Sequence, residues 1–277
     1  MASPTVPRTS FVRTFWTNAV MAPKTSLGFM RVDFVLGTVF VIPLTQMVFF
    51  AFVVRLGDAG ATASALTAAV QFTAIGNAVA TVTYSSVFSV CQTTDSEKWQ
   101  GTMEHLLVSP ANRLALYFGR GLIPILISLA TVCVGLTYAA LLFGVPIPTS
   151  SIAPLAVSVV LTAFAMVGFG LLLGGVALYL RTSIILGNIF LFVGLLLSGV
   201  NFPLSQLPTP LQWAGDALPL TWGLAAIRAA VGGSALPHLE LLWGAVALAG
   251  ALSFGAAISL WEVFERRALS TGSIARF

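Results

Sequence analysis

Six long runs of apolar residues, separated by short polar segments, constrain this chain more than any other feature of its sequence. A helix needs about 20 residues to cross about 30 Å of hydrocarbon, and each run is that long or nearly so. Hydrophobic residues make up 57% of the 277 residues and charged residues only 8%, which excludes a soluble domain of ordinary composition. We therefore expect an all-α integral membrane protein, a single transmembrane domain over residues 1–277. Its six predicted spans are Phe34–Val54, Ala65–Val90, Leu114–Phe143, Ile152–Leu180, Ser183–Val200 and Leu239–Val263.

The third and fourth runs are longer than a bilayer requires, and each contains a proline. Pro124 lies inside the third run and Pro154 near the start of the fourth. Proline removes a backbone donor and clashes with the preceding turn of a helix. The sequence therefore predicts that each of these spans either bends at its proline or starts partway along its run.

The placement of the basic residues predicts the orientation. With six spans both termini lie on one side, and the segments on that side hold all of the 13 Lys and Arg residues except Arg55 and Arg228. Loops rich in Lys and Arg stay in the cytoplasm. We expect both termini to be cytoplasmic, and the high Ala, Leu and Val content fits a bacterial plasma (inner) membrane.

Residues 1–33 contain no apolar run long enough for a span. A set of apolar side chains instead occupies one half of a short helical wheel: Phe11, Val12, Phe15, Trp16, Ala19 and Val20. The pattern predicts an amphipathic helix that lies along the membrane interface. The alternative is a disordered tail with chance periodicity.

Residues 93–110 form the longest polar interruption between the early spans, and they have the pattern of a helix. Thr94 can cap the first turn, Glu97 completes a capping box and Pro110 ends the helix. Trp99, Met103, Leu106 and Leu107 fall on one side of this helix, whereas Glu97, Lys98, Glu104 and His105 fall on the other. A cytoplasmic helix with such faces is typical of a docking element.

No Asp, Glu, Lys or Arg lies near the midpoint of a predicted span, which argues against an ion-coupled carrier. Uncharged polar residues instead cover one half of the second span. We consider two interpretations: these residues line a transport pathway, or they make hydrogen bonds between helices. The candidate pathway residues are Gln71, Asn77, Thr81 and Tyr84.

The segment of residues 199–233 is too broken by prolines to be a span, yet too apolar to be a free loop. It predicts two short helices, Leu211–Ala217 and Leu220–Val231, that form a re-entrant pair on the extracytoplasmic side. Arg228, near the end of the second helix, is interpreted as an interfacial anchor, with contact to a head group or substrate as the alternative.

The chain has no visible catalytic centre. It lacks a phosphate-binding G-x-x-x-x-G-K-[ST] loop, H-E-x-x-H, C-x-x-C and G-x-S-x-G, and its two histidines, His105 and His238, fall on opposite sides of the predicted membrane. We therefore expect no enzyme activity, no metal and no cofactor bound by this chain. Energy for any active process must come from another polypeptide.

Two segments resemble the type-2 ABC exporter permeases. Cys91–Arg120 resembles their cytoplasmic coupling region, E-x-x-x-G-T-x-E-x-L-L-x-x-P, and Ser198–Arg228 resembles their second signature. The residues that match the first are Glu97, Gly101, Thr102, Glu104, Leu106, Leu107 and Pro110. Those that match the second are Gly199, Phe202, Pro203, Leu207, Pro208, Pro219, Leu220 and Arg228. The chain looks most similar to the branch that exports antibiotics and nodulation factors.

The resemblance implies a half-transporter. Two permease chains, identical or homologous, would pair in the lipid membrane above two copies of a separate ABC ATPase, which binds ATP and Mg; no nucleic-acid partner is implied. It assigns contact with the ATPase to Glu97, Gly101, Glu104 and His105. The expected activity is ATP-driven export of an amphipathic small molecule, such as an antibiotic, a drug or a lipid-like compound. Export of a lipid-linked saccharide is the alternative, and a channel or membrane enzyme is a remote one.

Overall fold

A computed structural model of the chain describes residues 12, 16–17, 36–57, 60, 62–88, 113–180 and 183–271. Within these residues the secondary structure is helical and contains no strand, which confirms the all-α prediction for this part of the chain. The interfacial helix predicted in residues 1–33 and the docking helix predicted in residues 93–110 lie outside the described residues, apart from Val12, Trp16 and Thr17. Both therefore stay predictions.

The main helices follow the predicted apolar runs closely. In chain order they are α3 (Ile42–Gly57), α4 (Ala63–Thr83), α7 (Arg113–Phe143), α8 (Ile152–Leu180), α9 (Ser183–Leu197), α10 (Thr209–Asp216), α11 (Pro219–Val231) and α12 (Leu236–Thr271). Two π-helical turns extend this set, η1 (Gly37–Val41) before α3 and η2 (Tyr84–Phe88) after α4, and two short 3₁₀ turns, η3 (Thr149–Ser151) and η4 (Leu204–Gln206), lie in connections.

Five predicted spans are confirmed as helices that are long and apolar enough to cross a bilayer: Gly37–Gly57, Ala63–Val87, Pro124–Phe143, Thr149–Val176 and Leu236–Val263. The remaining predicted span, Ser183–Val200, is shorter, because α9 ends at Leu197 and Gly199 adopts a positive φ of 71°. At 1.5 Å per residue the 15 residues of α9 reach about 22 Å, less than the hydrocarbon thickness. A count of six spans therefore stays a prediction.

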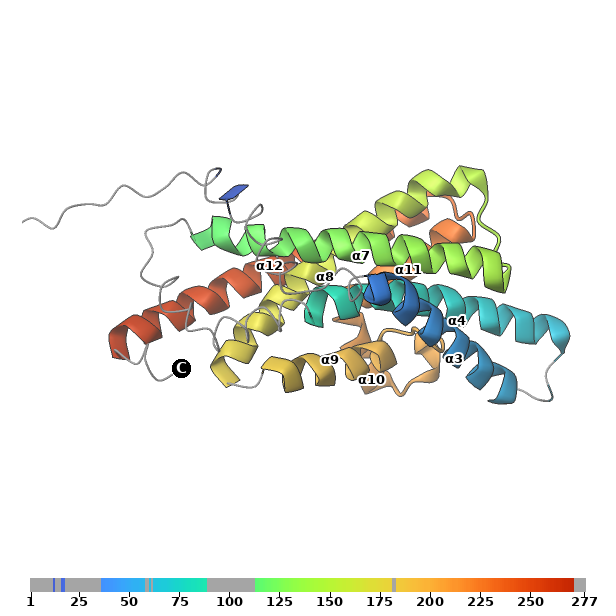
Figure 1. The fold of residues 1–277 in the computed structure, drawn as a ribbon, viewed down its shortest axis with the longest axis horizontal. Helices are drawn as coiled ribbons and strands as arrows, with labels where there is room; N and C mark the ends of the chain where they lie inside the picture. The colour runs from blue at the N-terminus through green and yellow to red at the C-terminus, as the bar shows by residue number, and fades with distance from the viewer. Residues whose placement is uncertain are drawn as a thin grey trace, which may run out of the picture.

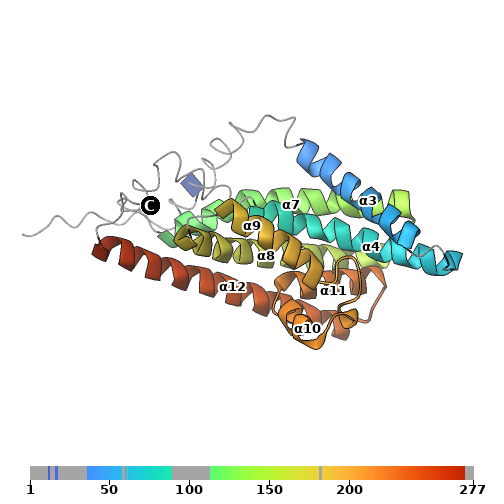
Figure 2. The ribbon, with the colours of Figure 1, turned by 90° about the horizontal axis from the view of Figure 1, so that it is seen from below.

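The helices lie roughly along one long axis, with α4 and α8 at the centre (Figures 1 and 2). In these two helices 61% of the most apolar stretch is buried, compared with 22% in α3 and α12, which lie at the periphery. The end of α3, the start of α4 and the connection between α7 and α8 lie at one end of the bundle (Figure 1). The start of α7 and the end of α12 lie together at the opposite end (Figure 1).

The two short helices α10 and α11 confirm the predicted interruption after the fifth apolar run. Pro208 precedes the first turn of α10, and Pro219 begins α11, positions where proline costs no helical hydrogen bond. Gly233, with φ 69°, closes α11, and the backbone N–H of Ser234 donates to the carbonyl of Ala229 (3.0 Å), as in a Schellman cap. We call residues 199–233 the hairpin.

The hairpin lies between the two ends of the bundle and not beyond either of them (Figures 1 and 2). Helix α11 packs against α8, α12 and α4. The close approach to α8 depends on Gly223, because a Cβ at that position would overlap the side chain of Thr162. The second short helix is therefore part of the protein interior.

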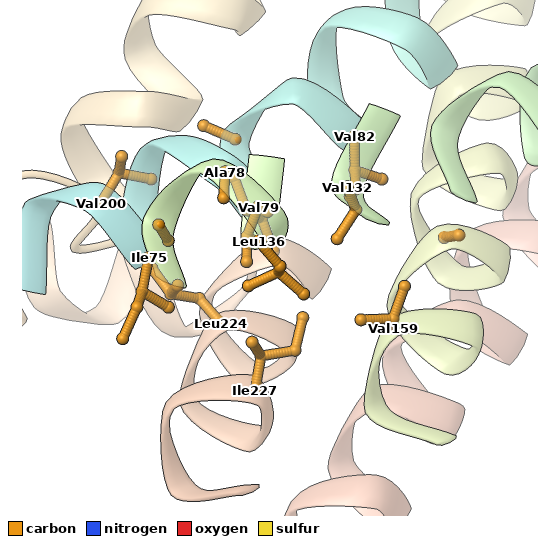
Figure 3. Packing of buried hydrophobic residues seen from close by; sticks show 14 of the residues in the cluster. Ile75, Ala78, Val79, Val82, Val132, Leu136, Val159, Val200, Leu224 and Ile227 are labelled. Carbon is orange, nitrogen blue, oxygen red and sulfur yellow. The ribbon is translucent and has the colours of Figure 1, made fainter. Parts of the chain in front are cut away.

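The main hydrophobic core forms where α4, α7, α8 and α11 meet (Figure 3). Helices α4 and α7 approach closely at Gly135, where an added Cβ would lie 2.9 Å from the Cβ of Ala78. Aliphatic side chains fill the space between the four helices, and interiors of this kind tolerate little change in volume. The labelled residues in Figure 3 are Ile75, Ala78, Val79, Val82, Val132, Leu136, Val159, Val200, Leu224 and Ile227.

Candidate functional site

The polar half of α4 faces the interior of the chain. Asn77 and Thr81, two of the candidate pathway residues, are only 1% and 2% exposed. The Nδ2 atom of Asn77 donates to the backbone carbonyl of Thr73 and to the Oδ1 atom of Asn201 in the hairpin, both at 2.9 Å. The hydroxyl of Thr81 donates to the carbonyl of Ala78 at 2.6 Å. Only the Asn77–Asn201 bond joins α4 to another segment, because the bonds to Thr73 and Ala78 lie within α4 itself.

The other two candidate pathway residues are Gln71, near the middle of α4, and Tyr84, directly after its end. The Nε2 atom of Gln71 donates to the carbonyl of Gly144 at 2.8 Å, and Gly144 has a φ of 64° in the turn that ends α7. Gln71 therefore stabilises the connection between α7 and α8. Tyr84 is the first residue of η2 and is half-buried. The structure does not bring Gln71, Asn77, Thr81 and Tyr84 together on one open surface, and their role as pathway lining stays a prediction.

Arg228 joins three parts of the fold that are distant in sequence. Its Nη1 atom donates to the carbonyl of Gly199 (2.9 Å), and its Nη2 atom donates to the carbonyls of Val200 (2.9 Å) and Phe72 (3.1 Å). The guanidinium carbon also lies 3.4 Å from the centre of the Phe72 ring, within the range of a cation–π interaction. One side chain of α11 thus binds the start of the hairpin and the middle of α4.

These contacts of Arg228 are made to the protein itself, and its role as an interfacial anchor stays a prediction. The guanidinium is half-buried, and its Nε atom is buried without a hydrogen-bond partner. The planar fork of arginine suits two adjacent carbonyl groups, and the backbone of Gly199 and Val200 provides them outside any helix. The positive charge of Arg228 is therefore stabilised by backbone carbonyls of the hairpin and not by the C-terminal end of α11.

Gly76 makes this arrangement possible, and sequence reasoning missed it. A Cβ at Gly76 would overlap the carbonyl oxygen of Val200 and lie 2.9 Å from the Nη2 atom of Arg228. Phe72 and Gly76 are four residues apart and share one face of α4. The signal in the sequence is a small residue one turn after an aromatic residue on the polar helix, but nothing there points to the hairpin as the partner.

The other predicted hairpin residues have structural roles at helix starts. Pro203 precedes η4 and Pro208 precedes α10, Pro219 begins α11 and is buried, and Phe202 lies half-buried between Gly199 and η4. Helix α10 packs closely on the end of α9, because a Cβ at Gly215 would overlap the carbonyl oxygen of Leu197. These residues therefore shape the hairpin.

Within the hairpin, side chains bind backbone carbonyls. Gln212 donates to Leu207 (2.7 Å), Thr221 to Gly215 (2.5 Å) and Trp222 to Asp216 (2.8 Å). The hairpin is therefore held together by its own side chains as well as by Arg228.

The site can position polypeptide segments, but its side chains do not suggest bond chemistry. In the described part of the chain no three His, Cys, Asp or Glu residues come close enough to hold a metal ion. The contacts around Arg228 and Asn77 are made to carbonyl groups and to an amide, which are structural partners. Together, the contacts of Arg228 and Asn77 fix the position of the hairpin relative to α4.

Helices of this length and composition define a multi-pass membrane protein. The family model of the ABC-2 type transporter matches residues 19–231, most of the chain, from before α3 to the end of α11. The chain therefore belongs to the ABC-2 type transporter family, as a transmembrane component that is not itself the ATPase. No individual curated protein matches the chain. The matched range includes Glu97, Gly101, Glu104 and His105, which lie outside the described residues.

Proposed function

We propose that this chain is the permease subunit of an ATP-driven exporter that moves an amphipathic small molecule, such as an antibiotic, a drug or a lipid-like compound. The molecule would leave the cytoplasm or the inner leaflet. The observation that carries this proposal is the ABC-2 match over residues 19–231, which contains the coupling motif from Glu97 to Pro110. The export direction and substrate class rest on the resemblance of that motif to the antibiotic and nodulation-factor exporters.

The proposed complex holds two permease chains and two copies of an ABC ATPase, which bind ATP and Mg. The family match supports an ATPase partner in general. The coupling residues Glu97, Gly101, Glu104 and His105 would contact it on the cytoplasmic side. This side follows from the placement of Lys and Arg, which also predicts that both termini are cytoplasmic.

We further propose that six segments cross a bacterial plasma membrane and that α9 and the hairpin together occupy the fifth position. Helix α9 alone is too short by about 8 Å, the difference between its length and about 30 Å of hydrocarbon. The position of the hairpin between the two ends of the bundle supports a re-entrant placement in the outer leaflet (Figure 2). Irregular backbone at this depth must be satisfied by protein, and Arg228 satisfies the carbonyls of Gly199 and Val200.

The test is affinity purification of the chain from its native membranes in mild detergent, with quantification of every co-eluting protein. The proposal predicts a nucleotide-binding subunit in equal number and ATP hydrolysis that amphipathic drugs stimulate in proteoliposomes. Stimulation by lipid-linked saccharides but not by drugs would favour the alternative substrate class. Elution of the chain alone in several detergents would contradict the proposed complex.

A further inference from the structure

Helices α4 and α7 each depart from regular α-helical geometry where they contact each other. In the proposed orientation this contact is nearer the cytoplasmic side of the membrane. Helix α4 passes into the π-helical turn η2 at Tyr84, and α7 contains Pro124 in its interior. A π-turn and an internal proline are the usual sites at which helices bend. Figure 1 shows η2 beside the middle of α7.

Three buried serines connect these two irregular sites. Ser86 and Ser128 are 0% exposed and Ser85 is 3% exposed. The hydroxyl of Ser128, in α7, lies 2.9 Å from that of Ser85 and 2.8 Å from that of Ser86, both in η2. Ser128 also donates to the carbonyl of Pro124 at 2.6 Å, so its oxygen accepts from the η2 serines. We call Ser85, Ser86 and Ser128 the serine cluster.

Within the serine cluster, Ser85 can exchange partners without leaving its hydroxyl unpaired. The single proton of Ser85 has three acceptors within reach: the carbonyls of Thr81 (3.0 Å) and Val82 (3.2 Å) and the hydroxyl of Ser128 (2.9 Å). An unpaired buried hydroxyl is costly, and a group with alternative acceptors avoids that cost when two helices change their angle. Serine hydroxyls bound to carbonyls one turn earlier also favour helix bending.

The neighbouring helix leaves room for the widened turn. A Cβ at Gly170 of α8 would lie 2.9 Å from the carbonyl oxygen of Ser86 and 3.3 Å from the Cα of Val87. On the hairpin side of the cluster, α4 and α7 are instead locked by the contact of Gly135 with Ala78. Helices α4 and α7 are thus tightly packed at Gly135 and Ala78. At the serine cluster they are joined instead by hydrogen bonds between hydroxyl groups.

We propose that the serine cluster is a paired hinge, at which α4 and α7 bend together relative to the rest of the bundle. The chain between η2 and α7 carries the predicted coupling helix; it follows directly after η2 and returns at Arg113, in the same helix as Pro124. In the transporter the hinge would convert movement of the docked ATPase into a change of angle of α4 and α7. This last role rests on the proposed function, whereas the hinge itself does not.

The hinge is tested first on the chain alone in lipid nanodiscs. Spin labels are placed at Ala115→Cys in the first part of α7 and at Val263→Cys near the end of α12, with Cys91 and Cys133 replaced by Ser. Pulsed electron paramagnetic resonance then gives the distribution of distances between the labels. Pro124→Ala restores a backbone N–H, so we expect it to narrow the distribution by about twofold. Equal widths in the parent and in Pro124→Ala would overturn the proposal.

Two further variants separate bending from general effects. Pro154→Ala is the matched control, because Pro154 lies in the first turn of α8 and Ser158 donates to its carbonyl (2.8 Å) just as Ser128 does to Pro124. We expect it to leave the distribution unchanged. Ser86→Ala removes a bond between the helices and keeps the other bonds of Ser128, so we expect a broader distribution. This variant keeps the test decisive if Pro124→Ala does not fold, since an unchanged width would contradict the hinge.

The transport role is tested on the assembled complex. With the co-purified ATPase in proteoliposomes, Pro124→Ala should lower the number of drug molecules exported per ATP hydrolysed by about fivefold. One restored backbone hydrogen bond would favour the straight form of α7 over the bent form by about this factor. An unchanged ratio in a variant with a narrowed distance distribution would overturn the hinge's role in coupling. Absence of any ATPase partner would refute the proposed function without altering the nanodisc result.

Discussion

Replacement of Arg228 by methionine should destabilise the chain by about 3–6 kcal/mol, the sum of two hydrogen bonds to a charged group. The guanidinium binds the carbonyls of Gly199, Val200 and Phe72 and lies against the Phe72 ring. Hydrogen bonds to charged groups each contribute about 1.5–3 kcal/mol. Gly199 and Val200 lie outside any helix, so we count both bonds, whereas the Phe72 carbonyl lies within α4 and we discount its bond. Methionine keeps the apolar stem, so the loss measures the polar contacts.

The assay is equilibrium unfolding of the purified chain in mixed micelles, followed by tryptophan fluorescence. Arg55→Met is the matched control, because Arg55 is exposed in the last turn of α3, and we expect a change within about 0.5 kcal/mol. Arg228→Lys should lose about half as much as methionine, since lysine keeps the charge but not the fork. Equal stability of the Arg228 and Arg55 methionine variants would refute the assignment of Arg228 as the joint between the hairpin and α4.

Three other substitutions test separate parts of the structure. Gly76→Ala places a methyl group against the hairpin backbone and should cost about 1–3 kcal/mol, whereas Gly194→Ala, with no atom within 4 Å of the added Cβ, should be neutral in the same unfolding assay. Asn77→Ala removes the bond to Asn201 and should cost about 1–2 kcal/mol without changing the drugs that stimulate ATP hydrolysis; a changed drug profile would favour the pathway interpretation. Glu104→Arg reverses one charge of the predicted coupling helix and should abolish export while the chain stays folded, and unchanged export in proteoliposomes would contradict that role.

Local patterns in the sequence predicted the helices well. The apolar runs predict the positions of α3, α4, α7, α8 and α12. A run of about 20 apolar residues is stable in a membrane as a helix whose side chains contact lipid or other helices. The prolines and the final glycines of residues 199–233 predicted α10 and α11 to within two residues at each end, since these residue types act through local backbone geometry.

The partners of the polar side chains could not be predicted in the same way. Periodicity places Asn77 on the polar face of α4 but does not say which segment covers that face, and the partner, Asn201, is 124 residues later. The inward position of Arg228 depends on the turn at Gly199 and on the missing side chain of Gly76. Contacts of this kind follow from the packing of whole helices, which one sequence does not specify.

The contacts of Arg228 also impose an order on the assembly of the protein. Its partner carbonyl in α4 is 156 residues earlier in the chain, whereas its partners at Gly199 and Val200 are 29 and 28 residues earlier. Because a ribosome delivers the chain from its N-terminus, α4 is already available when the hairpin is synthesised. All three carbonyls that Arg228 binds are therefore synthesised before Arg228 itself, so the chain never has to hold this charge in the membrane before its partners exist.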